Sequence, residues 1–183
     1  MGECDMVRAF WLWLVYSFFG FLLEKVFAFV TRSDNQDRKC FLFLPLCPVY
    51  GFGVLAILSL PQAVLQHPAA LFLYGALVST AVEYGVDLAY DRLLHVRFWN
   101  YEGMPGNLRG RVCLLFSFFW GFLSLPLVNL VHPRIADLPQ PTFLLPVAFC
   151  LLAADGLVSA VLLRRHRTPA ILCWYDRRAR GRV

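Results

Sequence analysis

The chain has 183 residues, of which 59% are hydrophobic and only 16% are charged, and its formal net charge is +5. Soluble domains usually carry about a quarter charged residues, so this composition excludes an ordinary soluble domain and predicts an integral membrane protein. We expect one transmembrane helical domain, residues 1–163, followed by a basic cytoplasmic tail, residues 164–183.

Five segments are apolar over about the twenty residues that a helix needs to cross a bilayer. They predict an all-α fold, a polytopic transmembrane helix bundle with about five spans, at residues 9–30, 41–61, 69–89, 112–131 and 142–163. The second segment begins FLFLPLCPVYGFG and contains Pro45 and Pro48. Proline lacks the amide hydrogen that a helix interior uses, so we expect this span to start irregularly or to be partly re-entrant.

Lysine and arginine are distributed unevenly between the loops. Residues 31–40 contain three, residues 90–111 four and residues 164–183 seven, whereas the loops of the other side contain only Arg8 and Arg134. Positive residues favour the cytoplasmic side of a membrane, so the N-terminus is predicted outside the cell and the C-terminus in the cytoplasm. The membrane is expected to be a cell membrane, the cytoplasmic membrane of a bacterium. Beside a span, the basic tail is expected to attract anionic lipids of the inner leaflet and not nucleic acid.

Charged side chains inside a span cost about 2.5–3.5 kcal/mol each on insertion scales, so each needs a physical reason. In the first span, Glu24 shares one helix face with Ser17 and Gly20. In the third span, small and polar residues repeat every four positions, namely Gly75, Ser79, Glu83 and Asp87. Small residues let another helix approach closely, so both faces are expected to point into the bundle.

These acids map to the predicted cytoplasmic half of the membrane, where two arginines precede the fourth span. An arginine beside a buried carboxylate stabilises the charged form of that carboxylate. We therefore predict a polar cluster that either binds a ligand or only locks the helices together. Its members are Glu24, Glu83, Asp87, Asn107, Arg109 and Arg111. Asp155 in the last span either joins this cluster or lines a separate polar face.

The sequence gives little support for catalysis. It contains no G-x-S-x-G elbow, no H-E-x-x-H and no Walker A loop. Its six cysteines include no C-x-x-C pair and no spacing typical of a zinc site. We expect no enzymatic activity, no cofactor and no metal; the remaining alternative is a membrane hydrolase or lipid transferase that uses Glu24, Glu83 and His95.

Four stretches carry a resemblance to a known family: SFFGFLLE (17–24), FLFLPLCPVYGFG (41–53), STAVEYGVD (79–87) and WNYEGMPGNLRGRVCLLFSFFWG (99–121). The chain resembles the small bacterial membrane proteins called "putative ABC transporter permeases of the CmpB type". The motif residues that match include four members of the predicted cluster, Glu24, Glu83, Asn107 and Arg111. The others are Pro45, Pro48, Tyr50, Gly51, Trp99, Tyr101 and Gly110. The chain departs from the family pattern at Arg38, Cys40, Leu44, Asn100 and Glu102.

The resemblance implies a transmembrane transport subunit with a polar site on the cytoplasmic side. Since the sequence lacks a Walker A loop, such a subunit needs a separate ATPase subunit, docked on the 31–40 and 90–111 loops. A homo-oligomer is the other possibility, because five short spans make a narrow bundle. The alternative is a non-transport membrane protein that binds lipid or a protein partner, with the polar cluster serving the structure alone.

Overall fold

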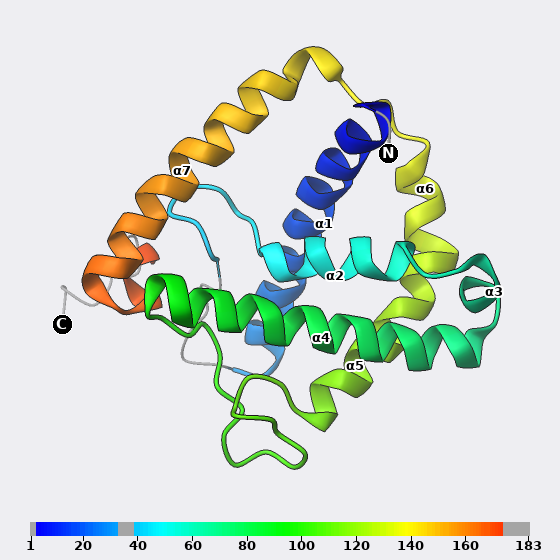
Figure 1. Ribbon diagram of the computed structural model, residues 1–183, viewed down its shortest axis with the longest axis horizontal. Coiled ribbons are helices and arrows are strands. Elements are labelled where there is room, and N and C mark those ends of the chain that lie inside the picture. The colour runs from blue at the N-terminus through cyan, green and yellow to red at the C-terminus, as the bar shows by residue number, and fades with distance from the viewer. Residues whose placement is uncertain (1–2, 33–38, 174–183) are drawn as a thin grey trace.

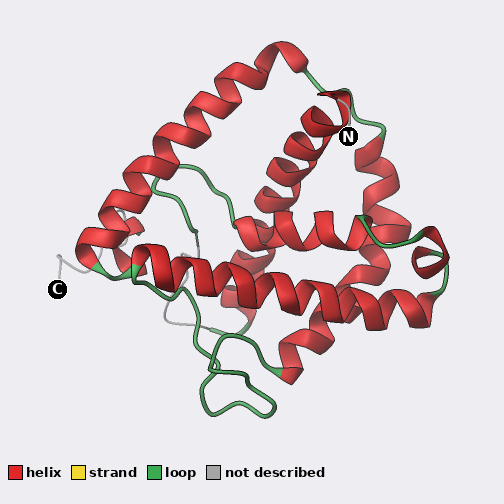
Figure 2. Cartoon of the chain, in the orientation of Figure 1, coloured by secondary structure: helices red, strands yellow, loops and turns green. Residues whose placement is uncertain are grey.

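The computed structural model describes residues 3–32 and 39–173, and every regular element in those ranges is helical (Figure 1; Figure 2). The α-helices are α1 (Glu3–Val30), α2 (Pro48–Leu58), α3 (Gln62–Leu65), α4 (Pro68–Leu94), α5 (Leu114–Pro126), α6 (His132–Ala136) and α7 (Leu145–His166). A π-helical segment, η1 (Leu127–Val131), joins α5 to α6, and two 3₁₀ turns, η2 (Thr142–Leu144) and η3 (Pro169–Leu172), flank α7. The predicted all-α class is confirmed, while the end of the predicted tail, residues 174–183, lies outside the described residues.

Four helical segments are long and apolar enough to cross a membrane: Asp5–Val30, Pro68–Leu94, Leu114–Ala136 and Thr142–His166. They coincide with four of the five predicted spans. Their outward surfaces are apolar, with side chains such as Phe29, Phe143 and Leu157 more than two-thirds exposed. Such a surface suits hydrocarbon and not water, so the chain is a multi-pass membrane protein.

The second predicted span differs from the expected continuous helix over 41–61. Only α2 is helical there, and its 11 residues measure about 16 Å, roughly half the thickness of the hydrocarbon core. Residues 41–47 before it are not helical, in keeping with the irregular start expected from the two prolines. Pro48 occupies the first turn of α2, where the missing amide hydrogen is tolerated.

In the view of Figure 1, the segment from α5 to α6 runs toward the end of the molecule where the N-terminus lies, and α2 and α4 lie across α1. α1 and α7 both begin at the end of the molecule where the N-terminus lies, and Phe10 and Phe149 are 6.4 Å apart between ring centroids there. α4 and α7 end side by side, where Val96, Leu163 and Leu172 form a buried cluster. Which end faces the cytoplasm stays a prediction from the charge pattern.

Small residues allow the helices to pack closely, as predicted for the two polar faces. A Cβ added to Gly51 of α2 would lie 2.3 Å from the Ser17 Oγ of α1, and one added to Gly20 would lie 2.3 Å from the ring of Tyr50. On α4, the buried residues are Leu71, Gly75, Ser79, Glu83 and Asp87, which includes every member of the predicted face. These contacts bring the acidic side chains of α1 and α4 into the interior.

Candidate functional site

A cavity of about 940 Å³ opens among α1, α2, α4, α5 and the loop of residues 95–113. Lys39, Cys40 and Cys47 close one side of it, together with Pro169 and Cys173 after α7. We call this space the central cavity. Residues 39–47, the 95–113 loop and residues 169–173 are far apart in the sequence and meet at this cavity. The charge pattern assigns all three segments to the cytoplasmic side.

Two carboxylates line the central cavity, each held by a neutral donor. The Tyr50 hydroxyl donates to Glu24 Oε1 at 2.7 Å. The Tyr101 hydroxyl donates to Glu83 Oε1 at 2.8 Å, and the Trp120 indole donates to Glu83 Oε2 at 3.0 Å. Glu83 is 5% exposed. The two predicted acids therefore do reach one cavity, but tyrosine and tryptophan contact them and the predicted arginines do not.

Aromatic rings form the wall around these carboxylates. The ring centroids of Tyr50 and Trp120 are 5.0 Å apart, and the ring of Tyr101 stacks on Phe116 at 4.8 Å. Trp99 also lines the cavity, and its indole donates to the Arg111 carbonyl oxygen at 2.9 Å. Burial and the adjacent Glu83 hold the pKa of Tyr101 well above its usual range, so this phenol stays protonated and remains a donor.

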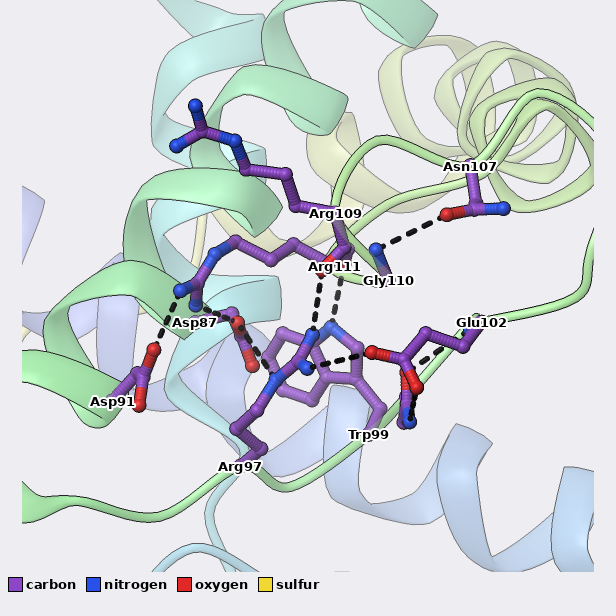
Figure 3. Close-up of polar contacts among 10 residues, drawn as sticks. Asp87, Asp91, Arg97, Trp99, Glu102, Asn107, Arg109, Gly110 and Arg111 are labelled. Carbon is purple, nitrogen blue, oxygen red and sulfur yellow. Dashed lines mark hydrogen bonds and ion pairs between the residues drawn. The ribbon is translucent and has the colours of Figure 1, made fainter.

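A separate ionic network lies one turn further along α4 (Figure 3). Arg111 contacts Asp87, which is fully buried, and places its second terminal nitrogen 2.5 Å from Asp91 Oδ2. Arg97 Nε lies 3.6 Å from Asp87 Oδ2. Hydrogen bonding to Asp91 raises the pKa of Arg111, so the pair stays ionised. The network fastens the 95–113 loop to α4.

Two members of the predicted cluster do not contact an acid. Arg109 is exposed, and Figure 3 shows its guanidinium pointing away from Asp87 and Asp91. The Asn107 amide donates to the Met104 carbonyl oxygen at 2.9 Å and accepts from the Gly110 amide at 3.2 Å. Asn107 therefore shapes the loop, and the structure does not bring it or Arg109 into contact with Glu24, Glu83 or Asp87.

Gly110 has a structural reason of its own in this loop. Its φ of +68° lies in the left-handed region, and an added Cβ would be 2.5 Å from the Asn100 Oδ1 atom. Its carbonyl oxygen accepts from the Tyr101 amide at 2.8 Å. The tight turn at Gly110 thus positions Tyr101 opposite Glu83.

Asp155 lines a separate polar face, one of the two alternatives left open by the sequence. It stands in the middle of α7, and its carboxylate accepts from the amides of Leu42, Phe43 and Leu44 at 2.7–3.3 Å. Ser159 adds a second acceptor for Leu42 at 2.8 Å. Asp155 thus supplies hydrogen-bond acceptors to the non-helical backbone of 41–47. The hydrocarbon of a membrane offers no such acceptors.

Three residues that contact members of the predicted cluster were not themselves predicted from the sequence, namely Asp91, Arg97 and Trp120. Asp91 lies four residues after Asp87, so extending the α4 face by one turn would have found it. Arg97 and Trp120 reach the acids only through the fold, because one sits in an irregular loop and the other in an aromatic run. Within residues 3–32 and 39–173, no three metal-binding side chains come together.

Comparison with known proteins gives one match. The model of a family described as "Putative ABC-transporter type IV" matches residues 11–160. This range contains α1 from its third turn onward, α2, α4, α5 and most of α7, together with every residue of the central cavity except two after α7. No match was found among curated proteins or among solved structures.

Proposed function

The chain belongs to the family described as "Putative ABC-transporter type IV", and on that premise we propose that it is a transmembrane transport subunit whose central cavity binds the transported molecule. One observation carries the proposal: a cavity of about 940 Å³ in the helix bundle contains a buried carboxylate, Glu83, ringed by aromatic side chains. Its volume is typical of small-molecule sites, and ionisable groups within the membrane usually mark substrate or ion pathways.

The 95–113 loop links this cavity to the surface of the protein. Tyr101 in the loop donates to Glu83, and Arg111 in the same loop is bound to Asp87 and Asp91 on α4. A partner that displaces the loop would therefore break or lengthen the hydrogen bond from Tyr101 to Glu83. We propose a separate ATPase subunit docked on this loop, or a second copy of the chain, in a bacterial cytoplasmic membrane. The proposal assigns no chemical step to the cavity, and His95 does not line it.

The partner is tested by purifying the tagged full chain from native membranes in a mild detergent and identifying bound proteins by mass spectrometry. We expect an ATPase in about equal amounts. Arg109→Glu, in the exposed part of the loop, should remove it, and Arg134→Glu, exposed at the other end of the bundle, should not. A preparation that contains only the chain itself and lipid would refute the ATPase-coupled mechanism.

The second candidate is a non-transport membrane protein that binds lipid or a protein partner. It is favoured by the saturation of Glu83, both of whose oxygens accept hydrogen bonds, as expected for a purely structural lock. Glu24→Gln and Glu83→Gln separate the two candidates. If the variants fold normally but lose function, the cavity is a binding site; if folding and function fall together, the carboxylates serve the structure.

A further inference from the structure

Resting on the proposed function, we infer that the ligand of the central cavity is an organic cation with an apolar body, whose positive group lies against Glu83. The three buried acids of the described chain differ in the groups that compensate their charge. Asp87 is paired with Arg111 and Arg97, and Asp155 is held by three backbone amides. Glu83 has only the neutral donors Tyr101 and Trp120.

A buried carboxylate is unfavourable in a low-dielectric interior unless several amides donate to it, as at Asp155, or a cation joins it. Arg97 and Arg111 are near Glu83 in the fold, but both form ion pairs with Asp87, which lies one turn along the same face of α4 (Figure 3). The fold therefore neutralises Asp87 internally and leaves Glu83, which opens on the cavity, to a partner that the described chain does not supply. Lys39 also lines the cavity, and its ammonium group donates to the Leu42 carbonyl oxygen at 2.6 Å. No ion pair joins Lys39 to Glu83 in the described part of the chain, and the inference therefore rests on Glu83 and not on Glu24.

The wall of the cavity suits a cation better than an anion or a neutral polar molecule. Tyr50, Trp99, Tyr101 and Trp120 all contribute to the lining, and their aromatic faces attract positive charge. The phenols and one indole are already oriented by the carboxylates, which places rings beside negative charge. Recognition of ammonium-type groups by an acid and surrounding rings follows from this combination.

The rest of the lining determines the other half of the ligand. Away from the carboxylates it consists largely of apolar side chains, among them Leu23, Phe27, Phe119 and Leu123. A small hydrated metal ion would gain nothing from such walls, and no three metal-binding side chains converge in the described ranges. A cavity of about 940 Å³ needs a ligand with a substantial apolar body to fill it.

The test uses the full chain in lipid nanodiscs and two probes of the same shape and opposite charge, tetraphenylphosphonium and tetraphenylborate, with empty nanodiscs as the blank. We expect saturable binding of tetraphenylphosphonium alone. Glu83→Gln should weaken it roughly 10- to 100-fold, the range for losing one charged interaction. Glu102→Gln, an exposed loop carboxylate outside the cavity, should leave it unchanged.

The wild-type comparison of the two probes decides the question even if the Glu83 variant fails to fold. Equal binding of both probes, or saturable binding of tetraphenylborate alone, overturns the cationic ligand and leaves the proposed binding cavity standing. Tetraphenylphosphonium binding that a folded Glu83→Gln variant retains in full also overturns the inference, since the cation then sits elsewhere. Absence of saturable binding by either probe overturns the cationic ligand and the binding cavity together.

Discussion

Replacing Asp155 by alanine tests how the membrane tolerates the non-helical backbone of residues 41–47. Among the described residues, Phe43 and Leu44 donate only to this carboxylate, at 2.7–3.3 Å, whereas Leu42 has Ser159 as a second acceptor. Asp155→Ala therefore leaves two amides without an acceptor. Each such amide costs about 1–3 kcal/mol, so we expect the free energy of unfolding to fall by about 2–6 kcal/mol.

Two further variants grade the effect. Asp155→Asn keeps one oxygen and should cost about half as much, because one amide is left facing a donor. Ser159→Ala should cost about 1 kcal/mol or less, since Leu42 retains Asp155 at 3.2 Å. Leu157→Ala, on the exposed face of the same helix, controls for general effects on α7.

Unfolding of the purified chain is measured in mixed micelles by titrating sodium dodecyl sulfate and following far-ultraviolet circular dichroism. Amide hydrogen exchange gives a local readout, in which Asp155→Ala should accelerate exchange in 41–47 and leave the amides of α4 unchanged. An Asp155→Ala variant as stable as wild type, with unchanged exchange in 41–47, would contradict the assigned role of the carboxylate.

Three other changes test the packing and the loop, each by the same unfolding titration. Arg111→Ala should cost up to about 3–5 kcal/mol because it leaves the fully buried carboxylate of Asp87 with Arg97 alone, 3.6 Å away, whereas Arg109→Ala should stay within about 0.5 kcal/mol. Gly51→Ala should cost about 1–3 kcal/mol, since its Cβ would lie 2.7 Å from a backbone oxygen of α1, whereas Gly85→Ala meets nothing within 4 Å and should be neutral. Because the pKa of Tyr101 is raised in the folded protein, the unfolded chain loses the phenolic proton at a lower pH, so the free energy of unfolding should fall above about pH 10. Tyr101→Phe should reduce that fall, and identical pH profiles of the two proteins would refute the assigned role of the Tyr101 hydroxyl.

The sequence predicted best where the information was periodic. The polar face of α4 repeats every four residues, and Gly75, Ser79, Glu83 and Asp87 are all buried as expected. The fifteen-residue stretch from residue 97 to 111 has no such period, so periodicity does not distinguish Arg111, which binds two acids, from Arg109, which is exposed. The family resemblance did separate them, since its motif includes Arg111 and not Arg109. The difference depends on the turn at Gly110, after which the guanidinium of Arg111 reaches Asp87 and Asp91 while that of Arg109 lies apart from them.

The length of the second span was unpredictable for another reason. Its apolar composition over 41–61 is that of a full helix, but the backbone of 42–44 takes its hydrogen-bond acceptors from α7. Local sequence carries no trace of a partner more than one hundred residues away. The same holds for Trp120, whose contact with Glu83 requires α4 and α5 to be packed first.

The dependence of residues 42–44 on Asp155 has a consequence for how the protein is made. Leu42 and Asp155 are separated by 113 residues, and ribosomes add about 5–20 residues per second. The second span is therefore synthesised roughly 6–23 s before its acceptors exist. During that interval its amides must stay hydrated in the insertion channel or at the membrane surface. Completion of the α1–α2 hairpin in the bilayer thus waits for the last helix, and a chain truncated before α7 should be recognised by the cell as unfinished.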